Sequence, residues 1–149
     1  MIISFDIDNT LIPYSNEFKT EQVSWFWKVM GAEPIRDGSI DLFKKLEKDG
    51  HQLWIYTTSF RSPFSLKKTF FAHGLQPKRI INQDVNQREL KKHQCMASKH
   101  PGLFGIDLHI DDSEGVRIEG EQYHFNTLIV RPDDTGWVEK VINAVGQLS

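Results

Sequence analysis

Short apolar segments alternate along this chain with longer segments in which apolar residues recur at helical spacing, and this alternation constrains the fold most. A strand followed by a helix, repeated along a chain, is typical of a parallel sheet with helices on both faces. We therefore predict an α/β fold, a Rossmann-like three-layer sandwich around a central, mostly parallel sheet of five strands. The predicted strands are residues 2–8, 52–57, 78–82, 106–110 and 125–130.

Start and stop signals delimit the helices between these strands. Asp37 is predicted to be the N-cap of the first, and Ser62, followed by Pro63, to open the second. Residues 115–121 contain two glycines and are predicted to form a turn region. The predicted helices are residues 37–50, 62–74, about 86–96 and the segment after residue 135.

The length of 149 residues predicts a single domain over residues 1–149. Hydrophobic residues make up 39% and charged residues 26%, which excludes a disordered tail and a membrane protein. One short insertion, residues 13–34, follows the first strand. Val23, Phe26, Trp27 and Met30 fit a helical stripe within it, so the insertion is predicted to be helical.

The net charge of −2 gives no overall attraction to nucleic acid or to an anionic membrane. Residues 1–5 lead directly into a strand and lack the features of a secretory signal. Cys95 is the only cysteine, so no internal disulfide forms and the thiol is expected to be structural. A cytoplasmic protein is expected. The six histidines show no zinc-ligand spacing and receive no role.

Polar clusters end three of the predicted strands. Asp6 and Asp8 end the first, the hydroxyl cluster 57–59 ends the second, and Asp111 and Asp112 end the fourth. Since the carboxyl ends of strands in an open α/β sheet converge on one crevice, these clusters form one candidate site. Several carboxylates in one crevice repel one another unless a cation or protons offset their charge, and oxygen ligands suit Mg²⁺. Magnesium is the predicted cofactor.

These clusters resemble the four motifs of the haloacid dehalogenase-like (HAD) superfamily. The motifs are Asp6-x-Asp8-x-Thr10, Thr57 after the second strand, a lysine, and Asp111-Asp112, and the resemblance spans nearly the whole chain. It implies that Asp6 attacks phosphorus to give an aspartyl-phosphate. It also implies that Asp8 protonates the leaving oxygen and then takes a proton from water, which marks phosphatase-type members.

The same resemblance implies the remaining roles. Mg²⁺ would be held by Asp6, by the backbone carbonyl of Asp8 and by Asp111, with Asp112 as the alternative ligand or as an anchor. Thr57, with Thr58 beside it, would bind the phosphoryl group together with a lysine. Lys99 is favoured for that lysine, and the rivals on the preceding helix are Lys91 and Lys92.

Members of this superfamily place their substrate-selecting cap after the first motif, and here residues 13–34 are short. The chain is therefore similar to cap-less or minimally capped members, including the magnesium-dependent phosphatase group. An open site would suit a bulky phosphorylated substrate, such as a phosphoprotein or a nucleic-acid end. A small phosphometabolite is the other option, and the oligomeric state is open.

Three other functions compete with a magnesium-dependent phosphomonoester hydrolase. A phosphate-binding or protein-interaction module with lost turnover is disfavoured by the retention of both Asp6 and Asp8. A phosphotransferase would share the nucleophile and differ only in the acceptor. A phospho-accepting receiver domain carries its acidic pair after the first strand, unlike Asp111-Asp112 here.

Overall fold

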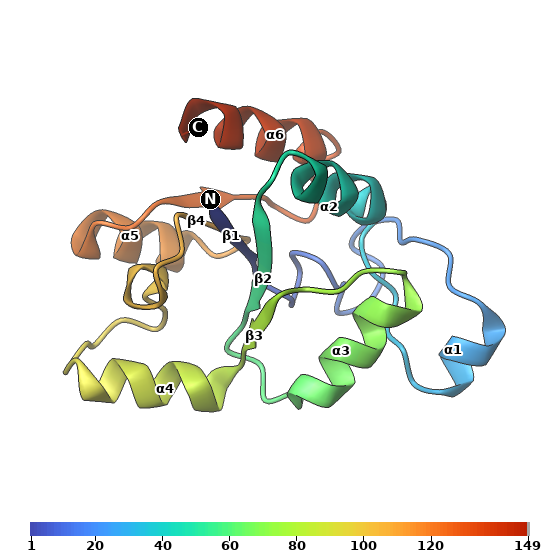
Figure 1. Ribbon diagram of the computed structural model, residues 1–149, viewed down its shortest axis with the longest axis horizontal. Coiled ribbons are helices and arrows are strands. Elements are labelled where there is room, and N and C mark those ends of the chain that lie inside the picture. The colour runs from blue at the N-terminus through green and yellow to red at the C-terminus, as the bar shows by residue number, and fades with distance from the viewer. Residues whose placement is uncertain (149) are drawn as a thin grey trace.

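A computed structural model describes residues 1–148 and contains one five-stranded sheet in the order β3-β2-β1-β4-β5 (Figure 1). Every strand pair is parallel, which confirms the predicted Rossmann-like α/β fold and sharpens the expectation of a mostly parallel sheet. The strands are β1 (Ile2–Phe5), β2 (Gln52–Tyr56), β3 (Arg79–Ile81), β4 (Leu108–Asp111) and β5 (Thr127–Ile129).

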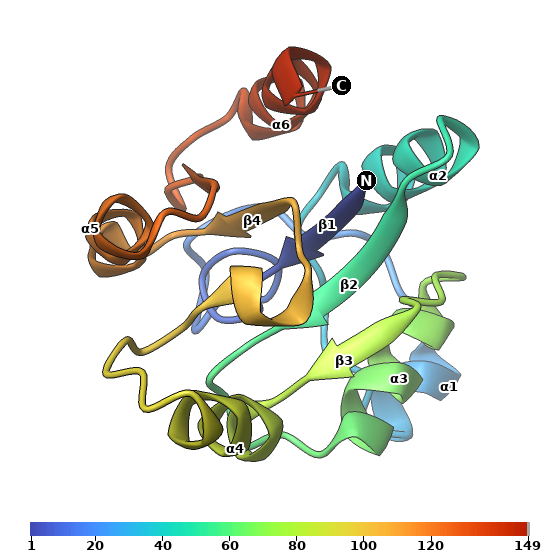
Figure 2. The same cartoon turned by 60° about the vertical axis from the view of Figure 1, so that its left-hand side comes forward.

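Helices cover both faces of this sheet (Figures 1 and 2). The helices α2, α3 and α6 pack on one face, while α4, α5 and the 3₁₀ helix η1 lie on the other. The helices are α1 (Trp25–Val29), α2 (Ser39–Lys48), α3 (Pro63–Ala72), α4 (Gln83–Lys92), η1 (Pro101–Phe104), α5 (Glu114–Tyr123) and α6 (Trp137–Leu148).

The alternation of side chains along the strands divides the core between these two faces. Ile3 and Phe5 of β1 are fully buried against α2, and the Phe5 and Phe43 rings lie 4.9 Å apart. Trp54 and Tyr56 of β2 pack on the opposite face, beside η1 and α4. Because both faces are covered, the strands are apolar on both sides, as the continuous apolar segments of the sequence predicted.

The start of α3 is as predicted, whereas the predicted cap of α2 is wrong. Ser62 is the N-cap of α3 and its hydroxyl accepts the Ser65 amide at 3.1 Å. At α2 the N-cap is Gly38, and Asp37 lies one residue earlier. The Glu21 carboxylate accepts the amides of Gly38 and Ile40, so a distant side chain satisfies this helix end.

The polar helix α4 begins three residues earlier than predicted and ends at Lys92. Its N-cap is Asn82, whose side-chain oxygen accepts the Val85 amide at 3.2 Å. Asparagine is a strong N-cap residue because its short side chain reaches the free amides of the first turn. This capping signal was present in the sequence, and it fixes the boundary.

The predicted turn over residues 115–121 is wrong, because this segment lies inside helix α5. Glycine is a poor helix former, which explains the expectation of a turn. In the structure Gly120 is buried where α5 crosses β5, and a Cβ at this position would lie 2.9 Å from the Phe125 carbonyl oxygen. Gly120 is therefore needed for the close approach of α5 to the following strand.

This contact gives a prediction with a matched control. Gly120→Ala should lower the free energy of unfolding by about 1–3 kcal/mol, because backbone atoms must move to accept the methyl group. Gly146→Ala in α6 meets nothing within 4 Å, so it should raise stability by roughly 0.5–1 kcal/mol through helix propensity. Urea unfolding of both variants checks this, and equal effects would contradict the packing role of Gly120.

The insertion carries a shorter helix than its apolar stripe suggested. Helix α1 spans only Trp25–Val29, and Val23 is buried in the extended segment before it. None of the five residues of α1 is buried. Across residues 1–148, no helix is long and apolar enough to cross a membrane.

Candidate active site

Asp6 and Asp8 follow β1 at the carboxyl edge of the sheet. The Asp6 amide donates to the Ile110 carbonyl at 2.8 Å, so the β1–β4 pairing continues to the carboxylate itself. Asp6 is buried and Asp8 is partly exposed. The loop between them and Ile12 is closed by backbone bonds, with Asn9 in the left-handed conformation at φ 57°. This tight turn fixes both carboxylates relative to the sheet.

Lys99 extends from the segment between α4 and η1 to the ends of β1 and β4. Its ammonium nitrogen lies 2.6 Å from Asp6 Oδ1 and 2.5 Å from Asp111 Oδ2. Lys99 is buried, with 3% of its surface exposed, so these are charge-assisted hydrogen bonds inside the protein. The structure therefore brings Lys99 to the acidic cluster. The rivals do not approach it, since Lys91 and Lys92 are exposed on α4.

Contacts from two helices and from β2 hold the Lys99 segment in place. Glu119 of α5 accepts the Ser98 amide at 2.6 Å, the Ser98 hydroxyl at 2.7 Å and the Lys99 amide at 3.3 Å. Asn86 of α4 donates to the Ser98 carbonyl at 2.8 Å. The Tyr56 hydroxyl accepts the His100 amide at 2.9 Å. The lysine is thus anchored on both sides by buried or partly buried polar groups.

His109 is a buried site residue that the sequence did not reveal. Its Nε2 lies 2.9 Å from Asp111 Oδ2, and its Nδ1 lies 2.8 Å from the Ser4 hydroxyl. An ionised carboxylate only accepts hydrogen bonds, so Nε2 carries the proton and donates to Asp111. A signal was available, because residues two apart on a strand share a face and His109 precedes Asp111 by two.

Burial and mutual charge shift the pKa values of this cluster. Burial, reinforced by the charge of Asp111, raises the pKa of the Asp6 carboxyl despite Lys99. Burial also acts to raise the pKa of Asp111, but His109 and Lys99 hold it well below its usual range. Burial opposes the charge on Lys99, yet Asp6 and Asp111 raise the pKa of its ammonium group. Asp111 and Lys99 therefore favour their charged forms and make an ion pair. The ionised form of Asp6 is instead disfavoured by burial and by the Asp111 charge.

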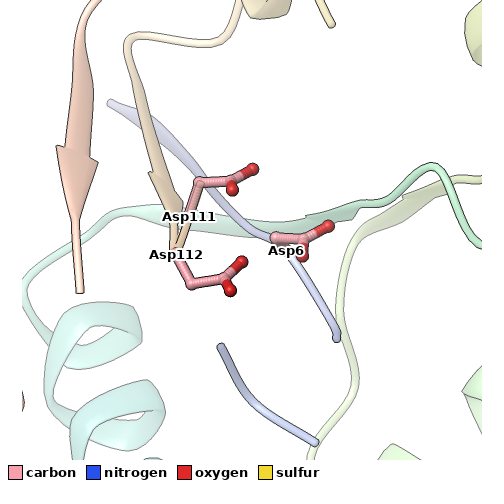
Figure 3. A group of neighbouring side chains, drawn as sticks. All are labelled: Asp6, Asp111 and Asp112. Atoms are coloured by element: carbon pink, nitrogen blue, oxygen red, sulfur yellow. The ribbon is translucent and has the colours of Figure 1, made fainter. Parts of the chain in front are cut away.

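A polar cavity of about 190 Å³ lies over these groups. The oxygens of Asp6, Asp111 and Asp112 approach within 4.8 Å of one another, and Figure 3 shows the three carboxylates projecting toward the same region. The lining residues are Asp6, Asp8, Tyr14, Thr58, Ser98, Lys99, Asp111, Asp112, Ser113 and Val116. The predicted clusters after β1 and β4 thus share one cavity.

The two threonines after β2 differ in position. Thr58 is exposed and lines the cavity, as expected of a residue that meets substrate. Thr57 is buried, is not among the lining residues, and its hydroxyl oxygen accepts the Ser59 amide at 3.1 Å. In this structure the Thr57 hydroxyl therefore stabilises the turn after β2, and Thr58 is the threonine that lines the cavity.

Arg61 connects the cavity to the insertion. Its guanidinium donates to Asp8 Oδ1 at 2.7 Å and binds both carboxylate oxygens of Glu33 at 2.8 and 3.0 Å. It also donates to the Ser59 hydroxyl at 3.0 Å. Burial acts against the charge, but the bonds to Glu33 and Asp8 raise the pKa of Arg61. Arg61 therefore remains cationic and orients the Asp8 carboxylate.

One solved structure resembles this chain over nearly its whole length. A predicted HAD-like family hydrolase from Porphyromonas gingivalis superposes with a TM-score of 0.50 and 12% sequence identity, covering 99% of this chain and 96% of that chain. This chain has a HAD-like fold. No protein-family model matches the sequence, and no curated protein matches it. At this identity the likeness shows the fold, and the chemistry depends on the residues in the cavity.

The acidic residues on this HAD-like fold suit a magnesium ion. The three clustered carboxylates offer oxygen ligands, which Mg²⁺ prefers. Burial and the Asp111 charge raise the pKa of Asp112, and the pKa of Asp6 is raised as well. Two destabilised anions in one cavity are the groups that a divalent cation would stabilise. The residues present therefore fit the predicted metal.

Proposed function

We propose that this chain is a magnesium-dependent phosphomonoester hydrolase that forms an aspartyl-phosphate on Asp6. The observation that carries the proposal is the Lys99 ammonium group, which binds both Asp6 and Asp111 beneath a polar cavity that Asp8 also lines. The proposed nucleophile Asp6, the Lys99 cation and the Asp8 carboxylate therefore line the same cavity. These are the groups that phosphoryl transfer to a carboxylate requires.

In the first half-reaction, an Asp6 oxygen would attack phosphorus while the bond from phosphorus to the leaving oxygen breaks. Asp8 would give its proton to that oxygen, and an alcohol would depart. Lys99 would offset the charge on the phosphoryl oxygens, since its ammonium group already touches Asp6. The product of this step is the aspartyl-phosphate with an ionised Asp8.

In the second half-reaction, water would attack the same phosphorus and give a proton to Asp8. The bond from phosphorus to Asp6 would break, which releases phosphate and regenerates the starting carboxylate and carboxylic acid. One water is consumed for each ester hydrolysed. The partly exposed position of Asp8 permits this entry of water.

Asp6, Asp112 and the backbone carbonyl of Asp8 would hold the magnesium ion, with Asp111 as an anchor beneath them. Asp111 is already occupied, because Lys99 and His109 bind one of its oxygens and the Ser113 amide binds the other. Asp112 lines the cavity and is only half-buried. When bound, the ion would screen the negative charge of the phosphoryl group from the carboxylates.

The direct test is phosphate release from p-nitrophenyl phosphate by the full chain with and without Mg²⁺. Turnover should require the ion, stop on addition of EDTA and return when excess Mg²⁺ is added. Release of nitrophenol without phosphate, in the presence of added alcohols, would instead indicate a phosphotransferase. No turnover of any phosphate ester would indicate the binding-module alternative.

Asp112 and Asp111 should respond differently to amide substitution. Asp112→Asn should weaken Mg²⁺ binding by about tenfold or more while leaving stability within about 0.5 kcal/mol, because this half-buried carboxylate is the proposed ligand. Asp111→Asn should instead lower stability by about 3 kcal/mol, since it breaks a buried pair with Lys99. Calorimetric Mg²⁺ titration and urea unfolding would separate the two, and the reverse pattern would exchange their roles.

Arg61 should matter most for esters with poor leaving groups. Because Arg61 orients Asp8, Arg61→Met should lower kcat for an alkyl phosphate about ten- to hundredfold more than for p-nitrophenyl phosphate, whose leaving group needs little protonation. Arg61→Lys should restore part of the alkyl-ester rate. Equal losses on both esters would show a general structural effect and contradict the positioning role.

A further inference from the structure

Helices α1 and α3 present an unusual concentration of exposed apolar side chains. The two helices lie side by side at one edge of the molecule, on the opposite side from α5 (Figures 1 and 2). Within residues 1–148, most of the large apolar side chains that are mainly exposed belong to these helices or their flanks. They are Trp25, Phe26, Val29, Met30, Phe60, Phe64 and Phe71. Contiguous exposed apolar patches often mark sites that bind a protein, a membrane or a ligand.

Between the two helices lies a groove of about 610 Å³. The Trp27 ring from α1 meets the Phe71 ring from α3 edge-on at 5.7 Å, which forms the floor where the helices touch. Phe64 stands at the other end of α3 and is 77% exposed. The remaining lining residues are Met30, Lys67, Lys68, Leu75, Gln76 and Pro77. The α1/α3 groove is therefore an apolar channel with a preformed aromatic floor.

The charge along this groove has one sign. Lys67 and Lys68 line it, and among the described residues its lining contains no carboxylate. Lys28 of α1 is exposed on the neighbouring turn. Cations at the rim of an apolar groove select a partner whose apolar residues are flanked by acidic ones. A second copy of this chain docking by the same face would place lysines against lysines, which disfavours a symmetric dimer.

Arg61 links the two helices of the groove to the candidate active site. Phe64 follows Arg61 by three residues, and Arg61 binds Asp8 at the cavity. Glu33, just after α1, binds the same guanidinium. From Phe64 to Phe71 the helix rises about 10 Å, which is the length of about three extended residues. A chain whose phosphoryl group reaches Asp6 could pass Arg61 and lie directly in the groove.

We propose that the α1/α3 groove docks an apolar segment with flanking acidic residues in a phosphoprotein substrate, and thereby selects that substrate. The inference rests on the proposed function for the phosphoryl end and on the groove for the remainder of the substrate. The apolar side chains would cover Trp27, Phe64 and Phe71, while carboxylates would meet Lys67 and Lys68. Aromatic residues in such pockets carry much of the binding energy at protein interfaces.

Phosphoserine peptides of defined composition test this proposal. One set carries the block Leu-Glu-Phe-Glu at successive distances from the phosphoserine, on either side. A second set replaces both glutamates by lysine, and a third replaces leucine and phenylalanine by serine. The values of kcat/KM for these peptides are compared with that for p-nitrophenyl phosphate, which cannot reach the groove. The best peptide of the first set should exceed its counterparts by about tenfold or more.

Variants of exposed groove residues locate the effect. Phe64→Ala and Met30→Ala should each lower kcat/KM for the best peptide by several-fold, and Lys67→Glu should reverse the preference between glutamate and lysine peptides. All three should leave p-nitrophenyl phosphate turnover unchanged. Met96→Ala and Lys91→Glu alter exposed side chains that do not line the groove and serve as controls.

Binding of the fluorescent, unphosphorylated peptides, followed by anisotropy, separates the two proposals, because it needs no turnover. Loss of all hydrolysis with groove-dependent binding retained would overturn the function and keep the groove. Hydrolysis with equal kcat/KM for all three peptide sets would overturn the groove alone. The groove proposal also fails if Met30→Ala dissociates a dimer seen by sedimentation, or if single-stranded DNA binds at Phe64 in place of the peptides.

Discussion

Asp6→Asn is expected to abolish phosphate release, with a fall in kcat of about ten-thousandfold or more, while the chain stays folded. The loss follows because an amide cannot act as the nucleophile that the proposed covalent route needs. Stability should change by no more than about 1 kcal/mol, since burial and the charge of Asp111 already disfavour the ionised Asp6. An amide oxygen can still accept the Lys99 hydrogen bond.

Phosphate release and urea unfolding, measured on the same preparation, check this pair of expectations. Asp107→Asn gives a matched control, because Asp107 lies at the opposite end of β4 and binds the Ile2 amide. That control should keep its activity. Residual turnover by Asp6→Asn near the level of the unaltered chain would show that another group attacks phosphorus.

Lys99→Met is expected to have the largest effect on stability. The substitution removes the cation between Asp6 and Asp111 and leaves two buried carboxylates side by side. Breaking a buried pair from one side costs about 3–5 kcal/mol, because the remaining charge is uncompensated. The kcat should also fall by about a hundred- to a thousandfold, as expected when a cation that stabilises the transition state is lost.

Added Mg²⁺ should recover part of this stability, since it supplies positive charge to the same carboxylates. Thermal unfolding with and without the ion measures this recovery. Lys91→Met and Lys92→Met are the controls, and each should stay within about 0.5 kcal/mol because both side chains are exposed. If Lys91→Met lost activity as Lys99→Met is expected to do, the assignment of the site lysine would be wrong.

The sheet and the acidic cluster could be predicted because both depend on local sequence patterns. The apolar segments ending at Asp6 and Asp111 became neighbouring parallel strands, and their carboxylates share a cavity. Parallel strands align their carboxyl ends at one edge of the sheet. These carboxylates could therefore be expected to meet without knowledge of how the helices pack. The HAD-like fold was implied by the resemblance of the motifs to that superfamily, and the solved structure supports it.

Contacts made across the chain could not be predicted in this way. Lys99 reaches Asp6 because Glu119, Asn86 and Tyr56 hold its segment, and these residues come from three separate elements. The bond from Arg61 to Glu33 likewise joins residues 28 positions apart. Neither contact leaves a periodic signal in the sequence. Long-range polar contacts therefore decide which lysine and which arginine belong to the site.

Helix α5 shows how a local rule fails when packing overrides it. Its glycines predicted a turn, but the close approach to β5 makes Gly120 favourable inside a helix. Helix α2 gives a second case, since Glu21 in the insertion caps it in place of Asp37. In both cases a tertiary contact compensates for a poor local preference.

The proposed covalent intermediate on Asp6 is tested most directly by mass spectrometry of the Asp8→Asn variant. With p-nitrophenyl phosphate and Mg²⁺, the first half-reaction needs little acid assistance, while the second lacks the base that activates water. The variant should therefore accumulate one phosphoryl group, located on the peptide containing Asp6 and removed by hydroxylamine. Steady turnover with no phosphoryl group on Asp6, or its location on another residue, would contradict the proposed mechanism.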